Sequence, residues 1–236
     1  KMTKVASDPG NYAAGVAYAY RYGPPEPGQD PEWIQEATFG NDDTAGKFGA
    51  SLAVSADTVV IAAPDWGDSS QGAVFCYHYD PAGTPQWSGP HPLLADGVAF
   101  DDGYACSVAV DGERVVVGAY ADDDKASDSG AVYCFSYCDL DGDEVYKLLA
   151  SDGASSDLFG TAVAVSGDFA IIGAPFDDDA ADNSGSAYIF DYAGIGLADT
   201  DGDGIADDCD NCPDHSNPCQ ADCDDDGIPD ECEIAD

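Results

Sequence analysis

One segment recurs three times along the chain at a nearly constant spacing. FGASLAV begins at Phe48, YACSVAV at Tyr104 and FGTAVAV at Phe159, so the spacing is 56 and then 55 residues. A polar turn of two or three residues follows each copy and leads into a second, β-branched run. These runs are TVVIAAP (58–64), RVVVGAY (114–120) and FAIIGAP (169–175). Such pairs are typical of β-hairpins, and a period of this length indicates one structural unit repeated in space.

Each hairpin is followed by an acidic Gly/Ser loop and a third run in which alternate residues are aromatic. The four copies of this run are GVAYAYRY (15–22), GAVFCYHY (72–79), GAVYCFSY (130–137) and GSAYIFDY (185–192). A period of two places the aromatic side chains on one face of a strand. We expect them to pack neighbouring sheets together rather than to form a ligand platform.

A weaker fourth strand is predicted around Trp33-Ile34, Leu93-Leu94 and residues 145–149. Four short antiparallel strands per repeat, stacked face to face, are the plan of a β-propeller. We therefore predict an all-β fold, a partial β-propeller of four-stranded antiparallel blades, followed by a small irregular calcium-loop tail. The predicted domains are residues 1–193 (a partial blade at about 1–45 and repeats at about 46–97, 98–153 and 154–193) and the tail, residues 194–236.

The FG and (G/A)AP segments, followed by G-x-(V/A)-(Y/F)-x-(F/Y), resemble the FG-GAP repeat of integrin-α propellers. That resemblance implies a propeller of seven blades, some with a calcium loop between the first two strands. Here the corresponding turns, 55–57, 111–113 and 166–168, are too short to enclose calcium, so we expect no calcium there. The acidic loops at 122–124 and 177–179 lack ordered ligand spacing. We expect them to be solvated, with a weak ion site as the alternative.

The charge of the chain limits its partners. Asp and Glu number 47 against seven Lys and Arg, which gives a formal net charge of −40. Nucleic acids and anionic membrane surfaces would be repelled, and no run of 18 apolar residues predicts membrane insertion. Extracellular calcium is the natural source of counter-ions.

Nine cysteines, five of them between Cys209 and Cys232, also favour an oxidising compartment. We therefore expect a secreted or cell-surface protein.

The tail contains two segments with the spacing of calcium loops. Residues 199–210 and 222–233 each carry carboxylates at positions 1, 3, 5, 9 and 12, glycine at position 6 and isoleucine at position 7. Ca²⁺ prefers six to eight oxygens at about 2.4 Å, and glycine permits the sharp bend. We predict about two Ca²⁺ ions. The predicted ligands are Asp199, Asp201, Asp203, the carbonyl of Ile205, Asp207 and Asp210, and Asp222, Asp224, Asp226, the carbonyl of Ile228, Asp230 and Glu233.

The residues between the loops resemble the thrombospondin type 3 repeat, through Asp-Asn-Cys-Pro at 210–213 and Asn-Pro at 217–218. That resemblance implies that calcium and disulfides replace a hydrophobic core. A dockerin-like module is the rival interpretation, but its helices are disfavoured by Pro213, Pro218 and Pro229.

Disulfide connectivity stays open. Cys223 could pair with Cys232, and Cys212 with Cys219, which would leave Cys209. Two further cysteines, Cys106 and Cys134, lie in the first and third strands of one repeat and could be buried thiols or a bridge. The odd total leaves one cysteine free or intermolecular.

No constellation in the sequence predicts an enzyme. The histidines His78, His91 and His215 lie on a predicted strand, a Pro-flanked loop and the tail, and there is no phosphate loop, G-x-S-x-G or zinc pairing. The first functional hypothesis is a structural subunit in which partial propellers self-associate head to tail, forming a helical filament if the contacts do not close into a ring. The second is a glycan- or protein-binding adhesion module of a larger cell-surface protein.

Overall fold

The computed structural model describes residues 3–8, 15–25, 29–40, 46–67, 70–80, 86–112, 114–136, 143–191 and Thr200. Within these residues every regular element is a strand, and no helix capable of spanning a membrane is found there. The strands are β1 (Thr3–Asp8), β2 (Val16–Gly23), β3 (Glu32–Gly40), β4 (Leu52–Ser55), β5 (Thr58–Ala63), β6 (Ala73–Tyr79), β7 (Trp87–Leu93), β8 (Tyr104–Asp111), β9 (Arg114–Ala119), β10 (Ala131–Ser136), β11 (Asp143–Leu148), β12 (Ala162–Ser166), β13 (Phe169–Ala174) and β14 (Ser186–Asp191).

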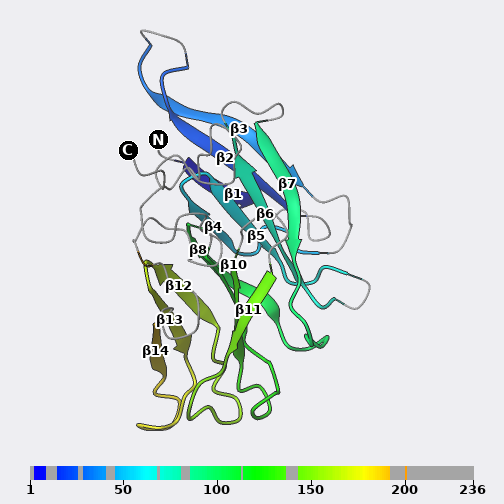
Figure 1. Ribbon diagram of the computed structural model, residues 1–236, viewed down its shortest axis with the longest axis vertical. Coiled ribbons are helices and arrows are strands. Elements are labelled where there is room, and N and C mark those ends of the chain that lie inside the picture. Colours follow the sequence, from blue (N-terminus) through cyan, green and yellow to red (C-terminus); the bar gives the residue numbers. More distant parts are fainter. Residues whose placement is uncertain are drawn as a thin grey trace, which may run out of the picture.

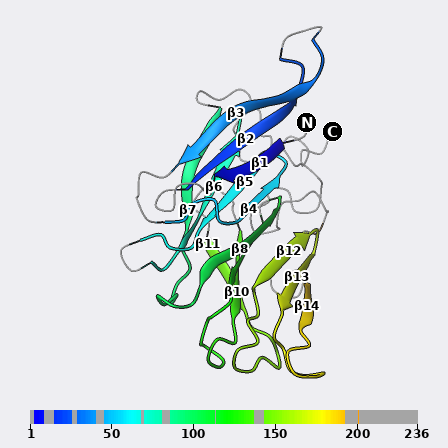
Figure 2. The ribbon, with the colours of Figure 1, turned by 180° about the vertical axis from the view of Figure 1, so that it is seen from behind.

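The strands form four antiparallel sheets. Their orders are β1-β2-β3, β4-β5-β6-β7, β8-β9-β10-β11 and β12-β13-β14. We call them the N-terminal sheet and the first, second and third repeats. Figure 1 shows them following one another from the N-terminal sheet at the top to the third repeat at the bottom, and Figure 2 shows the same row from behind. The predicted all-β, partial β-propeller architecture is confirmed, and the sheets do not close into a ring.

A two-residue turn joins the first two strands of every repeat. The registers end on the pairs Ser55–Thr58, Asp111–Arg114 and Ser166–Phe169. The first turn residue has a positive φ in each case, 44° at Ala56, 56° at Gly112 and 52° at Gly167. Left-handed residues suit such short turns because their twist matches that of the paired strands.

The core lies between successive sheets, and each inner sheet uses both of its faces. In the second repeat, Val115 and Val117 pack toward the first repeat, whereas Val116 packs toward the third. Aromatic rings of the third strands lie within these junctions, as the alternating pattern predicted. Tyr133 and Phe135 share an apolar cluster with Val60 of the first repeat, for example. The expectation that the aromatic residues pack sheets together is therefore confirmed for the three repeats, but not for the copy in the N-terminal sheet.

The glycine before the third strand packs against the next repeat in the first and second repeats. A Cβ atom on Gly130 would lie 2.0 Å from the carbonyl oxygen of Phe159, and one on Gly72 would lie 2.7 Å from that of Tyr104. The glycine of one repeat therefore admits the backbone of the FG or YA segment of the next. This contact explains why both motifs recur in the same register.

One sequence expectation about the strands was wrong. His91 lies within β7 and not on a loop, although Pro90 and Pro92 flank it. Strand β7 is at the edge of its sheet, where a residue without a backbone N–H costs no ladder hydrogen bond on the open side.

Candidate functional site

A buried ionic cluster lies in the second repeat, between the loop after β9 and strands β10 and β11. Asp122 is 1% exposed, and its Oδ2 accepts hydrogen bonds from the Tyr133 hydroxyl (3.0 Å) and from Nζ of Lys147 (2.6 Å). Nζ of Lys147 also donates to Asp124 at 2.7 Å and lies 4.9 Å from the centre of the Tyr133 ring. One ammonium group thus forms ion pairs with two carboxylates, which leaves the three charges with a net of −1.

The protonation states in this cluster follow from its burial and its hydrogen bonds. Burial alone would lower the pKa of Lys147, but hydrogen bonds to Asp122 and Asp124 outweigh it and raise that pKa overall. Burial raises the pKa of Tyr133. The lysine is therefore charged and the tyrosine neutral at physiological pH.

Two members of this cluster recur in the third repeat, fifty-five residues further along the chain. Asp177 corresponds to Asp122, and Tyr188 corresponds to Tyr133. Asp177 is 2% exposed, and the Tyr188 hydroxyl lies 2.6 Å from its Oδ2 and 2.8 Å from Oδ1 of Asp152. Since a hydroxyl has one proton, it can donate to only one of these carboxylates at a time. Both Asp122 and Asp177 were expected in solvated loops, which is wrong because a tyrosine of the third strand draws each of them inward.

In the third repeat, Asp177 belongs to a group of three acidic side chains. Carboxylate oxygens of Asp152, Asp177 and Asp179 lie within 4.8 Å of one another. In the described part of the chain, no lysine or arginine forms an ion pair with them, and no fourth strand follows β14. These three carboxylates have the donor chemistry to hold a metal ion, and sequence analysis did not single out Asp152.

The pKa directions reflect this crowding. A hydrogen bond from Tyr188, followed by one from the backbone N–H of Asp179, lowers the pKa of Asp177. The charges of Asp177 and Asp152 raise the pKa of Asp179. Burial and the hydrogen bond to Asp177 raise the pKa of Tyr188. Asp177 therefore stays ionised to a lower pH than Asp179.

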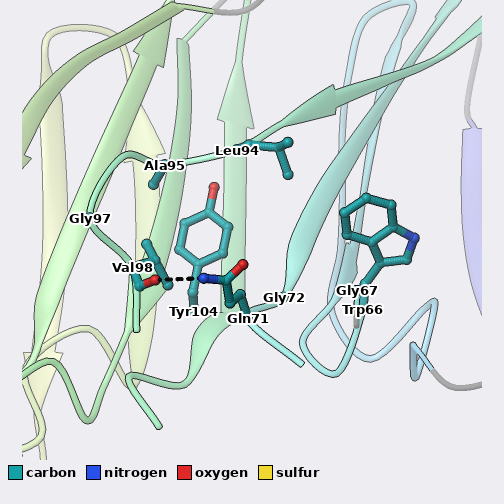
Figure 3. Close-up of a pocket in the computed structure, with 9 residues that line it drawn as sticks. All are labelled: Trp66, Gly67, Gln71, Gly72, Leu94, Ala95, Gly97, Val98 and Tyr104. Atoms are coloured by element: carbon teal, nitrogen blue, oxygen red, sulfur yellow. Dashed lines mark hydrogen bonds between the residues drawn. The ribbon is translucent and has the colours of Figure 1, made fainter. Parts of the chain in front are cut away.

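The first repeat has an apolar version of the same contact. Trp66 and Phe75 occupy the positions of the Asp–Tyr pair and pack edge to face at 5.6 Å. Trp66 also lines a pocket of about 240 Å³ together with Gln71, Leu94 and Tyr104. The side-chain amide of Gln71 donates a hydrogen bond to the carbonyl oxygen of Val98 at 3.2 Å. Figure 3 shows this contact, with the indole nitrogen of Trp66 directed away from Tyr104. Among the described residues, the lining of this pocket includes no Asp, Glu, Lys, Arg or His.

The predicted calcium ligands of the tail, from Asp199 to Glu233, all lie outside the described residues, as do the five tail cysteines and His215. The two loops therefore stay a sequence prediction. Of the pairings left open, the bridge between Cys106 and Cys134 is excluded. Both are thiols, and β9 separates their strands in the sheet. Burial raises the pKa of Cys106 and of Cys76, which disfavours their reactive thiolate forms.

Together, the repeated sheets and their shared junctions define an open module of the β-propeller class. Residues 87–135 and 143–190 each match the FG-GAP repeat. Each matched segment begins with the fourth strand of one sheet (β7 or β11) and ends in the third strand of the next (β10 or β14). FG-GAP repeats typically occur in extracellular or cell-surface proteins and are typical of adhesion-type modules. A comparison with curated proteins found no match.

Proposed function

We propose that the protein is a secreted, calcium-binding structural protein whose copies associate head to tail into an extracellular filament. The observation that carries this proposal is the difference between the inner and the end sheets. The first and second repeats have four strands each, whereas the N-terminal sheet and the third repeat have three described strands each.

Among the described residues, the two end sheets lack opposite strand positions, the first strand in the N-terminal sheet and the fourth strand in the third repeat. Strand β1 pairs with the aromatic strand β2 as β5 pairs with β6, so β1 occupies the second-strand position and no described strand precedes it. The third repeat has a first, second and third strand but no described fourth. Contacts between two different ends of a molecule are heterologous, and they extend into helical filaments unless the rotation closes a ring. Open strand edges are also known templates for association.

Calcium has a physical role in such an assembly. Copies that each carry a formal charge of −40 repel one another, and bound divalent cations reduce that repulsion. The two loops of the tail, which resemble thrombospondin type 3 repeats, are the proposed sites for about two Ca²⁺ ions. Their ligands would be the alternating carboxylates from Asp199 to Asp210 and from Asp222 to Glu233.

The proposed activity is assembly and not catalysis. His78 is exposed on β6, and His91 lies on the edge strand β7. The thiols of Cys76 and Cys106 have raised pKa values. A second candidate function, a glycan- or protein-binding adhesion module, is favoured by the two FG-GAP matches, because that repeat is typical of adhesion-type propellers.

Electron microscopy and sedimentation of the full chain, in calcium and in a chelator, test the proposal. We expect fibres in calcium that shorten or vanish on chelation. The paired substitution Asp201→Asn and Asp224→Asn should have the same effect as the chelator. Asp57→Asn with Asp101→Asn is the matched control, because it removes equal charge from exposed positions outside the loops. Monomers in both conditions would contradict the filament, and binding of the monomer to a glycan or protein array would then favour the adhesion module.

A further inference from the structure

The outward side of the third repeat is an apolar sheet face that no described residue covers. The registers Ile171–Ile189 and Gly173–Ala187 place these four residues on one side of β13 and β14. We call this surface the terminal face. Ile171 is 49% exposed and Ile189 is 69% exposed.

The residues at the same positions in the other repeats are buried. Ile171 is the third residue of its second strand, as are Val60 in the first repeat and Val116 in the second. Both valines are fully buried. Counted from the third-strand glycine, Ile189 corresponds to Cys76 and Cys134, which are also fully buried. The terminal face is therefore chemically the same surface that two earlier sheets bury.

The surface that buries these positions is always the aromatic side of the following sheet. Cys76 and Val60 share an apolar cluster with Tyr133 and Phe135 of the second repeat. In the same way, Val116 and Cys134 pack with Tyr188 and Phe190 of the third. Each junction thus joins an aliphatic face to an aromatic face, and the internal junctions show which chemistry fits the terminal face.

An aromatic face of this kind lies uncovered at the other end of the row. Tyr18 and Tyr20 occupy the positions of Tyr133 and Phe135, but both are partly exposed. Next to them Tyr22 and Trp33 stack at 5.4 Å and are 42% and 47% exposed. The opposite side of this sheet is already used, because Ala17, Ala19 and Phe39 pack on the first repeat.

Charge also favours the pairing of these two faces. The residues named so far on the two faces are all uncharged. Within β13 and β14, Asp191 is the one acidic residue that lies on the same side as Ile171 and Ile189. In a chain with a formal charge of −40, two such surfaces can approach with little local repulsion.

We propose that the terminal face binds the aromatic face of the N-terminal sheet of a second copy and so reproduces the internal junction between molecules. This inference rests on the proposed self-association and identifies the two surfaces that carry it. It does not depend on the calcium loops.

Complementary variants of the full chain test this contact by sedimentation. Ile171→Glu with Ile189→Glu should weaken association at least tenfold, and so should Tyr22→Glu with Trp33→Glu. When the two double variants are mixed, one intact interface remains, so dimers should form and stop there. Leu94→Glu with Phe100→Glu is the matched control, because both residues are exposed and lie away from the two end faces. Unchanged association of both double variants would overturn the inference.

Maleimide labelling of an Ile189→Cys variant, read by peptide mass spectrometry, separates this inference from the filament proposal. Protection that increases with protein concentration is expected, and it would support the contact even if assembly stops at dimers. Protection independent of concentration would mean that the chain covers its own terminal face. Rapid labelling at every concentration would mean that nothing binds there. Either of the last two results overturns the inference.

Discussion

Oδ2 of Asp111 accepts a hydrogen bond of 2.7 Å from the backbone N–H of Gly167, so the hairpin turn of the second repeat is tied to that of the third. The same relationship joins the first and second repeats, where the Gly112 N–H donates to Oγ of Ser55 at 3.1 Å. In both cases the residue just before one turn accepts a hydrogen bond from the glycine of the next turn.

Removing one of these acceptors should loosen the adjacent junction. Asp111→Ala leaves the N–H of Gly167 without its acceptor and should lower the free energy of unfolding by about 1 kcal/mol. Hydrogen exchange of the Gly167 amide should become faster. Ser166→Ala is the control, because Ser166 is the equivalent acceptor in the third repeat and no described turn follows it. An effect of equal size at Ser166 would contradict this interpretation.

The buried ion pair of the second repeat should contribute far more than a surface pair. Lys147→Met leaves the carboxylate of Asp122, which is 1% exposed, without its counter-ion, and should cost about 3 kcal/mol. Lys47→Met breaks an ion pair with Asp65 whose side chains are 60% and 39% exposed, and should cost less than about 1 kcal/mol. Urea denaturation of both variants gives the comparison. Equal losses would show that Asp122 is solvated.

The Tyr188 hydroxyl should control the acid stability of the third repeat. Its hydrogen bond lowers the pKa of Asp177, so this carboxylate contributes stability above its unfolded pKa and loses it as the pH falls toward the folded value. Tyr188→Phe should raise the pKa of Asp177 and cost about 1 kcal/mol at neutral pH. The cost should shrink in acid. NMR titration and denaturation at several pH values measure both effects, and Tyr20→Phe, at an exposed hydroxyl, is the control. A pH-independent loss would contradict the assignment.

Two glycines in matching positions should respond differently to alanine. Gly130 and Gly185 both have positive φ, 84° and 73°, so the backbone strain of alanine is similar, about 1 kcal/mol. At Gly130 the new Cβ would also meet Phe159 of the next repeat at 2.0 Å, whereas at Gly185 its nearest neighbour is Pro175 of the same repeat at 3.1 Å. Gly130→Ala should therefore cost at least about 3 kcal/mol, and Gly185→Ala about 1 kcal/mol. Thermal unfolding measures both, and similar losses would contradict the contact.

The strands and their order could be predicted because their signals are local. A period of two in GAVYCFSY and a polar turn at residues 111–113 specify a strand and a hairpin without knowledge of the rest of the chain. The prediction of a loop at His91 was wrong because the flanking prolines are excluded from inner strands but tolerated in an edge strand. Which strand lies at an edge depends on the whole sheet and not on the local sequence.

The burial of Asp122 and Asp177 could not be predicted in the same way. It depends on a tyrosine brought back by the third strand and, in the second repeat, on Lys147 from the fourth. One signal was present, since aspartate precedes tyrosine by eleven residues in both repeats. Residues 122 and 133 are separated by the same number of residues as 177 and 188. This equal spacing would have indicated a contact that recurs in both repeats. The calcium loops of the tail stay a prediction.

In the described part of the chain, the apolar clusters each join one sheet to its neighbour, so a substitution that disrupts one junction should have little effect on the others. A substitution between the second and third repeats should detach β12–β14 while the sheets nearer the N-terminus keep their packing. Unfolding of this molecule is then expected to proceed as a sequence of separations along the row, starting from an end, with the order set by the weakest junction. In the proposed filament, such a row under tension would lengthen stepwise, one junction at a time.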